Sequence, residues 1–181
     1  YKLQSLSAAQ IKMVLHDFSR RLLDETSRIL EANRRDLAKM EPENPLYDRL
    51  LLNEERLQAI AADVVKVSEL ESPVGEVLET RELPNGTFLS RHRVPLGVVG
   101  AIYEARPNVT MDIFSLCFRT QNACVLRGGT DAHETNMVTA GIIQDCLNAH
   151  DLPREAVYLM PPERSFMPLM LQAYGLIDVC I

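Results

Sequence analysis

The second half of the chain alternates between short apolar runs and helix-like segments, and this pattern restricts the fold more than any other feature. From Gly97 onward, the strand-like runs GVVGAIYEA, ACVLRGG, AVYLMP and IDVCI are separated by segments with the apolar spacing of helices. Short continuous apolar strands that alternate with helices are typical of a parallel sheet with right-handed crossovers. The pattern predicts an α/β fold with a Rossmann-like sheet and flanking helices, an architecture of the dinucleotide-binding type.

The first 76 residues have a helical pattern instead. Ser7 and Gln10 form a capping-box sequence, and apolar residues then recur at helical spacing to about Lys39. Two prolines break this pattern, after which Asn53 is placed to cap another helix with an acidic first turn. We expect residues 1–76 to form a helical segment that packs on the sheet.

Residues 77–93 contain two β-prone runs on either side of Asn85-Gly86, a strong hairpin signal. Alternation in the second run indicates a ribbon with one covered face. Such an arm could extend a sheet across subunits, so we expect it to support a homo-oligomer. Residues 94–181 are then the α/β domain.

Composition excludes several classes of protein. The chain has 181 residues, 46% of them hydrophobic, which is ordinary for a globular protein. A net charge of −6 argues against non-specific nucleic-acid binding. No apolar run reaches the roughly 18 residues of a membrane span, and the N-terminus lacks the layout of a signal peptide. We expect a cytoplasmic protein that binds neither nucleic acid nor a membrane.

Both ends suggest a longer polypeptide. There is no initiator Met, and the sequence stops within the apolar run LIDVCI. Because a buried strand needs neighbours that cover or continue it, we expect the chain to be a fragment.

The cysteines stand within apolar segments and share no metal-ligand spacing. We therefore expect buried structural thiols and no metal site. The four are Cys117, Cys124, Cys146 and Cys180.

The stretch VLRGGTDAHETN joins a predicted strand to a predicted helix. Gly128 and Gly129 would let a ligand approach the backbone, and a helix N-terminus favours negative charge. Arg127 could pair with a phosphate. The alternative is a tight turn in which Thr130 or Asp131 caps the helix. Neither a G-x-G-x-x-G nor a Walker A motif is present to decide between them.

A second polar stretch, Arg106-Pro107-Asn108, follows the first strand of the sheet. It is either a rigid loop in which Asn108 caps the next helix, or a device that aims the Asn108 amide at developing negative charge. Glu104 and Arg106 could contact charged groups of a substrate, or pair with each other. The residues by themselves leave these alternatives open.

The stretch from Arg93 to Asn136, RVPLGVVGAIYEARPNVTMDIFSLCFRTQNACVLRGGTDAHETN, closely resembles the γ-glutamyl phosphate reductases (glutamate-5-semialdehyde dehydrogenases) of proline biosynthesis. IYEARPN and LRGG are specific to this branch of the aldehyde dehydrogenase superfamily, and the resemblance extends over nearly the whole chain. It implies the NADPH-dependent reduction of L-glutamyl 5-phosphate to L-glutamate 5-semialdehyde and phosphate. The family's C-terminal catalytic region has no counterpart here, so the chain would be the cofactor-binding part.

The resemblance also implies roles for individual residues. Asn108 corresponds to the oxyanion-hole amide, and Arg127 to the basic residue beside the adenosine end of the cofactor. Thr130 and Asp131 stand where many NAD-preferring relatives carry a Glu, which fits a preference for NADPH. Pro161 would help to shape the adenine pocket. We therefore expect Asn108 and Arg127 to line one cleft at the carboxyl ends of adjacent strands.

In the implied reaction a cysteine thiolate attacks the acyl phosphate, phosphate leaves, and hydride reduces the resulting thioester. That nucleophile should lie beyond this chain, because neither Cys117 nor Cys124 follows a suitable loop or has a cation beside it. We expect functional coupling with glutamate 5-kinase. The alternatives are the reductase half of a bifunctional pyrroline-5-carboxylate synthase, and a non-catalytic nucleotide-binding or dimerising remnant.

Overall fold

The structure, a computed structural model, describes residues 2–104 and 106–181. Seven α-helices occur in these two ranges: α1 (Ala8–Asp24), α2 (Thr26–Leu37), α3 (Tyr47–Leu50), α4 (Glu54–Glu69), α5 (Pro107–Arg119), α6 (His133–Ala149) and α7 (Met167–Leu171). The strands of the same ranges are β1 (Val77–Glu82), β2 (Phe88–His92), β3 (Val98–Ile102), β4 (Ala123–Arg127), β5 (Val157–Leu159) and β6 (Val179–Cys180).

The last four strands form the predicted parallel sheet, in the order β5-β4-β3-β6. β3 and β4 run in register, so that Ile102 and Arg127 are neighbours at the carboxyl edge. The first strand of the sheet has later strands on both of its sides. Because ligands of open α/β sheets bind outside the carboxyl ends of the strands near such a reversal of strand order, this edge is where a site is expected.

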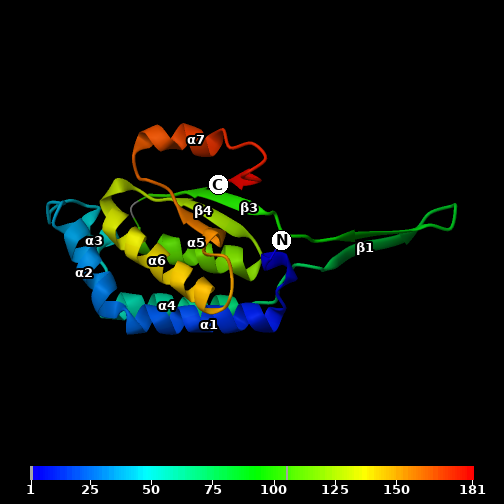
Figure 1. Ribbon diagram of the computed structural model, residues 1–181, viewed down its shortest axis with the longest axis horizontal. Coiled ribbons are helices and arrows are strands. Elements are labelled where there is room, and N and C mark those ends of the chain that lie inside the picture. The colour runs from blue at the N-terminus through cyan, green and yellow to red at the C-terminus, as the bar shows by residue number, and fades with distance from the viewer. Residues whose placement is uncertain (1, 105) are drawn as a thin grey trace.

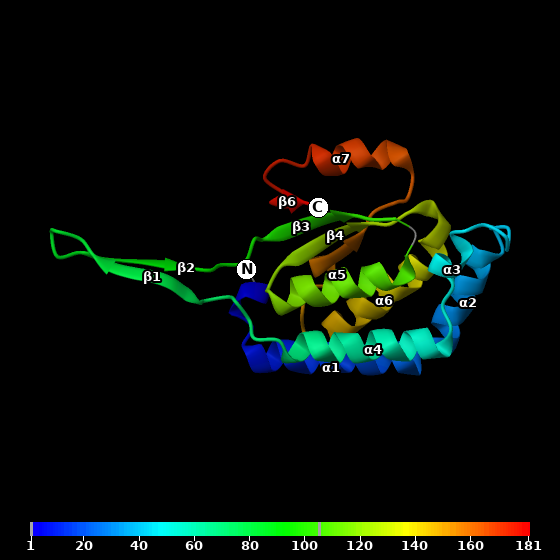
Figure 2. The ribbon, with the colours of Figure 1, turned by 180° about the vertical axis from the view of Figure 1, so that it is seen from behind.

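The sheet separates two unequal layers (Figures 1 and 2). On one face lie α5 and α6, with α1 and α4 packed outside them; α7 lies on the opposite face. Strand alternation fits this arrangement, since Cys124 and Leu126 join the main core. Gly100 points the other way, where an added Cβ would meet Met170 of α7 at 2.7 Å. Most of the buried apolar surface therefore lies between the sheet and the N-terminal helices.

Local capping signals position the N-terminal helices as predicted. Ser7 and Gln10 form both bonds of a capping box at α1, and the Asn53 side chain accepts a 2.7 Å hydrogen bond from the Arg56 N–H at α4. The long helical pattern to about Lys39 is divided into α1 and α2, however. At the break, the Thr26 hydroxyl donates to the Leu23 carbonyl at 2.7 Å, and such local bonds favour a helix boundary.

The hairpin of β1 and β2 forms as predicted and projects from the body of the molecule (Figure 2). Gly86, at φ 81°, takes the left-handed conformation that a turn of this kind needs. Every residue of both strands is exposed, so none of the described residues covers the face that alternation predicted to be covered. The covered face stays a prediction, which a second copy of the chain would have to fulfil.

Three of the four cysteines are buried, as predicted. Cys180 of β6 is exposed, and the prediction of a buried thiol is wrong there because β6 pairs with β3 on one side only. Within the described residues, no helix has the length and apolar character that crossing a bilayer requires.

Candidate functional site

The segment after β3 begins α5 without a side-chain cap. Pro107 occupies the first turn, where its missing N–H costs nothing. Asn108 lies inside the helix and does not cap it, so the capping alternative for this residue is wrong. Its Nδ2 instead donates a 2.9 Å hydrogen bond to Oδ2 of Asp112, one turn further on. Both side chains are half-buried.

The last residue of β4 directs its side chain away from α5. Arg127 is 7% exposed, and its Nη2 donates to the Pro162 carbonyl at 2.8 Å, in the connection from β5 to α7. Its Nε is buried with no hydrogen-bond partner among the described residues. Pro161, the predicted wall of an adenine pocket, belongs to the same connection and is half-buried.

Asn108 and Arg127 therefore lie on opposite faces of the sheet. Cys124 and Leu126 point toward α5, so strand alternation turns Arg127 toward α7. The expectation that the two residues line one cleft is wrong, although both lie at the carboxyl edge. A side chain's face depends on the register of its strand, which the motif did not fix.

Asp36 of α2 completes the start of α6. Its buried carboxylate accepts hydrogen bonds from the N–H groups of Glu134 and Thr135, at 3.0 and 2.8 Å. The Thr135 hydroxyl adds a third, at 2.8 Å. The alternative in which Thr130 or Asp131 caps this helix is therefore wrong. The negative charge that its N-terminus favours comes from within the chain, which leaves less of this terminus for a phosphate than the motif suggested.

The space beside Gly128 is filled by side chains of the same chain. A Cβ there would lie 2.3 Å from Nδ2 of Asn136 and 3.1 Å from the Tyr103 ring, so this glycine is required for close packing. A buried chain of hydrogen bonds holds these neighbours: Tyr103 Oη and Thr110 Oγ1 are 2.6 Å apart, and Thr110 donates to Asn136 at 2.8 Å. Burial raises the pKa of Tyr103 to about 12, so its hydroxyl stays protonated.

A pocket of about 330 Å³ opens at the same edge. It brings together the predicted substrate residues and the predicted cofactor loop. Glu104 and Arg106 form no ion pair with each other within the described part of the chain, so their charges remain available to a ligand. The pocket is lined by Met40, Leu46, Arg49, Leu50, Glu104, Arg106, Gly129, Thr130 and Asp131.

Arg49 is the lining residue that sequence reasoning missed. It comes from α3, in the N-terminal segment, and nothing in its local sequence associates it with residues 104–131. With Arg106 it supplies two guanidinium groups beside the two carboxylates of Glu104 and Asp131. This charge distribution suits a ligand that carries both an anionic and a cationic group.

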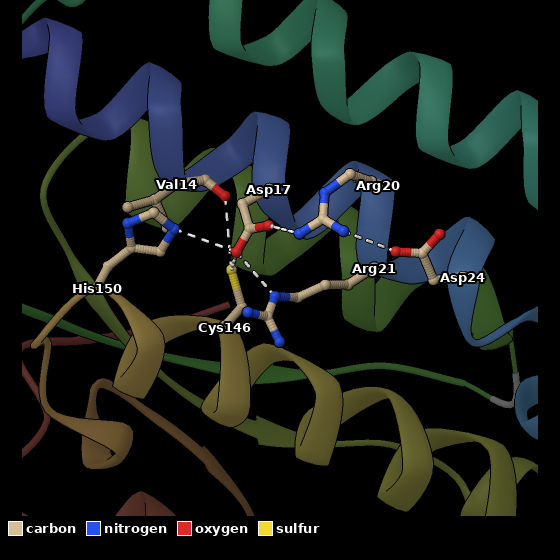
Figure 3. A network of polar contacts seen from close by, with 7 residues as sticks. All are labelled: Val14, Asp17, Arg20, Arg21, Asp24, Cys146 and His150. Atoms are coloured by element: carbon tan, nitrogen blue, oxygen red, sulfur yellow. Dashed lines mark hydrogen bonds and ion pairs between the residues drawn. The ribbon is translucent and has the colours of Figure 1, made fainter.

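One cluster has ligand types that could hold a metal ion (Figure 3). Single ligand atoms of Asp17, Cys146 and His150 lie within 4.8 Å of one another. Although burial raises the pKa of Asp17, hydrogen bonds from Arg21 and Arg20 lower it to about 2. Burial raises the pKa of Cys146 to about 12, which disfavours a thiolate ligand. The cluster is therefore best described as an ion-pair network that ties the end of α6 to α1.

The arrangement of helices and strands identifies the fold class: the chain has an aldehyde dehydrogenase-type fold. No protein-family model matches it. Solved aldehyde dehydrogenases nevertheless share the fold. One of them is glyceraldehyde-3-phosphate dehydrogenase GapN from Methanocaldococcus jannaschii, complexed with NADP. Its superposition covers 98% of this chain and 37% of the GapN chain, with a TM-score of 0.69 at 16% identity.

The more similar relatives are γ-glutamyl phosphate reductases. The one from Chlorobium phaeobacteroides is 48% identical over 180 residues, which cover 99% of this chain and 43% of that protein. The solved structure of the Thermotoga maritima reductase has a TM-score of 0.93 at 30% identity, over 98% of this chain and 44% of that one. The predicted resemblance is confirmed. This chain spans less than half the length of these relatives.

Proposed function

We propose that this protein takes part in the NADPH-dependent reduction of L-glutamyl 5-phosphate to L-glutamate 5-semialdehyde and phosphate, with this chain as the cofactor-binding part. The observation that carries the proposal is the 48% identity to a γ-glutamyl phosphate reductase over 180 residues. The open pocket at the carboxyl edge supports it, because five residues predicted from the sequence line that pocket.

The residues of this edge fit a phosphorylated nicotinamide dinucleotide. Arg127 keeps a buried Nε–H without a partner among the described residues, so the guanidinium still has a donor to offer. Gly129, Thr130 and Asp131 line the pocket, and Thr130 stands where many NAD-preferring relatives carry the Glu that would repel a 2′-phosphate. We propose that these four residues and Pro161 hold the cofactor, which when bound would supply the hydride.

Asn108 is proposed as the donor that stabilises the oxyanion of the reduction step. One N–H of its amide is used by Asp112, and among the described residues the second has no acceptor and can donate to a ligand. One such donor typically lowers a barrier by about 3–4 kcal/mol. Cys124 is an unsuitable nucleophile, because its hydrogen bond with Cys117 and its burial raise its pKa well above the usual value.

A homo-oligomer is the second part of the proposal. Phe88 of the projecting hairpin is 71% exposed, and Val77 is 52% exposed. Large apolar side chains on an arm with no covering element are typical of a surface that a second copy covers. Coupling to glutamate 5-kinase and a cytoplasmic location stay predictions from the sequence.

The test is calorimetric titration of the protein with NADPH and with NADH. We expect NADPH to bind at least about tenfold more tightly, since a hydrogen bond to a charged group contributes about 1.5–3 kcal/mol. Thr130→Glu places a carboxylate on an exposed site and should remove that preference. Arg127→Ala should weaken NADPH binding selectively.

Arg154→Ala is the matched control. Arg154 pairs with Asp145 at 3.0 Å, before β5 and hence at the opposite edge of the sheet, so its loss should leave both affinities unchanged. If wild-type protein that is folded by circular dichroism binds neither nucleotide, the assignment of the cofactor site to this chain is wrong.

A further inference from the structure

The hydrogen bond between Asn108 and Asp112 does more than join two turns of α5. An amide side chain can rotate by half a turn and exchange its oxygen for its nitrogen with little change in shape. A carboxylate only accepts hydrogen bonds, so Asp112 favours the orientation with Nδ2 toward it, at 2.9 Å, and disfavours the flipped one. Asp112 therefore determines which end of the Asn108 amide lies where.

The surroundings of Asp112 make its ionised carboxylate unfavourable for the stability of the fold. It is half-buried, and among the described residues it forms no ion pair. Burial raises its pKa, the hydrogen bond from Asn108 lowers it, and the negative charge of Asp63 on α4 raises it further. A half-buried carboxylate without a cation is unfavourable for stability. A role toward Asn108 would account for its presence.

We propose that Asp112 is a positioning residue, which holds the Asn108 amide with its nitrogen presented and its second N–H directed to the oxyanion. The inference rests on the proposed function, because it takes Asn108 as the oxyanion donor. The charge of Asp112 would also polarise the amide, since hydrogen bonds to ionised acceptors are stronger than neutral ones.

The first experiment compares variants of the full-length protein in steady-state kinetics. Asn108→Ala should lower kcat about 100-fold or more. Asp112→Ala should lower kcat about 10-fold to 100-fold and leave KM for both substrates within about twofold, because it mis-positions a group that acts in the transition state. The double variant should be no slower than Asn108→Ala, since both changes disable the same oxyanion hydrogen bond.

Asp63→Asn is the matched control. Its carboxylate is 58% exposed and pairs with Lys66 at 2.8 Å, so its loss should leave kcat unchanged. Three results would overturn the inference: Asp112→Ala as active as Asp63→Asn, a double variant slower by the product of the two single effects, or a raised KM at unchanged kcat. The last would make Asp112 a substrate contact. An unaffected Asn108→Ala would instead contradict the oxyanion role in the proposed function.

A second measurement needs no catalysis. In nitrogen-15 NMR spectra of this chain, the side-chain amide signal of Asn108, assigned by its loss in Asn108→Ala, should shift as Asp112 protonates. That titration should be centred above the usual aspartate pKa of about 3.9, and it should vanish in Asp112→Asn. A signal that does not respond between about pH 7 and about pH 3 in folded protein would show that Asp112 does not hold the amide.

Discussion

The first turns of α5 and α6 both follow strands at the carboxyl edge of the sheet, and they are completed differently. Asp36 fills the start of α6 with a buried carboxylate that accepts three hydrogen bonds. Among the described residues, no side chain caps α5, and the second amide N–H of Asn108 has no hydrogen-bond partner. At the same edge of the sheet, the start of α6 therefore serves stability, and the start of α5 remains available for chemistry.

The contrast extends to the far end of α6. There His150 and Cys146 contact Asp17 of α1, at 3.2 and 3.6 Å (Figure 3). Acidic residues of the N-terminal helices thus hold α6 at both ends, whereas the polar contacts of α5 run from Thr110 to Asn136 and from Arg119 to the Leu70 carbonyl. The comparison predicts that α6 contacts affect stability and that polar groups at the start of α5 affect catalysis.

The largest expected effect comes from Asp36→Ala. It would leave two backbone N–H groups and one hydroxyl without their acceptor in a buried place, and it should lower the free energy of unfolding by about 3 kcal/mol or more. Urea denaturation monitored by circular dichroism measures this. A loss below about 1 kcal/mol would show that water replaces the carboxylate and that the start of α6 is not tightly held.

The network at the other end of α6 should make stability depend on pH. The folded pKa of Asp17 is about 2, below its ordinary value of 3.8. Its contribution is therefore complete above about pH 4 and is lost as the pH falls through 2. The difference amounts to about 2 kcal/mol. Unfolding free energies of wild type and Asp17→Asn should converge as the pH falls, and a constant gap between them would contradict the assignment.

Loss of the local cap at α4 should lower the free energy of unfolding less than loss of the cap that Asp36 of α2 supplies to α6. Asn53→Ala removes a single hydrogen bond to the Arg56 N–H at an exposed helix start. The expected loss of unfolding free energy is about 1 kcal/mol. If thermal and urea unfolding give a loss as large as that of Asp36→Ala, the distinction between local and tertiary capping does not hold for this protein.

The smallest effect is expected at Thr130 and Asp131, which the sequence offered as alternative caps for α6 and which do not cap it. Thr130→Ala and Asp131→Ala remove exposed side chains that do not bond to the start of α6. Each should change the unfolding free energy by less than about 0.5 kcal/mol. A loss near 1 kcal/mol for either would return the capping role to this loop.

Features that depend on neighbours in the sequence were predictable. The apolar runs after Gly97 predicted the parallel sheet, and Asn85-Gly86 predicted the hairpin turn. Ser7 and Asn53 predicted two helix starts. Each signal acts through a strand period, a turn conformation or a cap bond within a few residues, so the local sequence carries all the information it needs.

The tertiary structure decided the rest, because those features depend on residues that are distant in the chain. Asp36 bonds to Thr135 across 99 positions, and Arg49 lines the pocket of Thr130 from another helix. The face on which Arg127 lies follows from strand register, which also separates it from Asn108. The sequence by itself determined the elements and the edge at which a site forms. Packing determined which polar groups at that edge are already bonded within the chain and which remain free to bind.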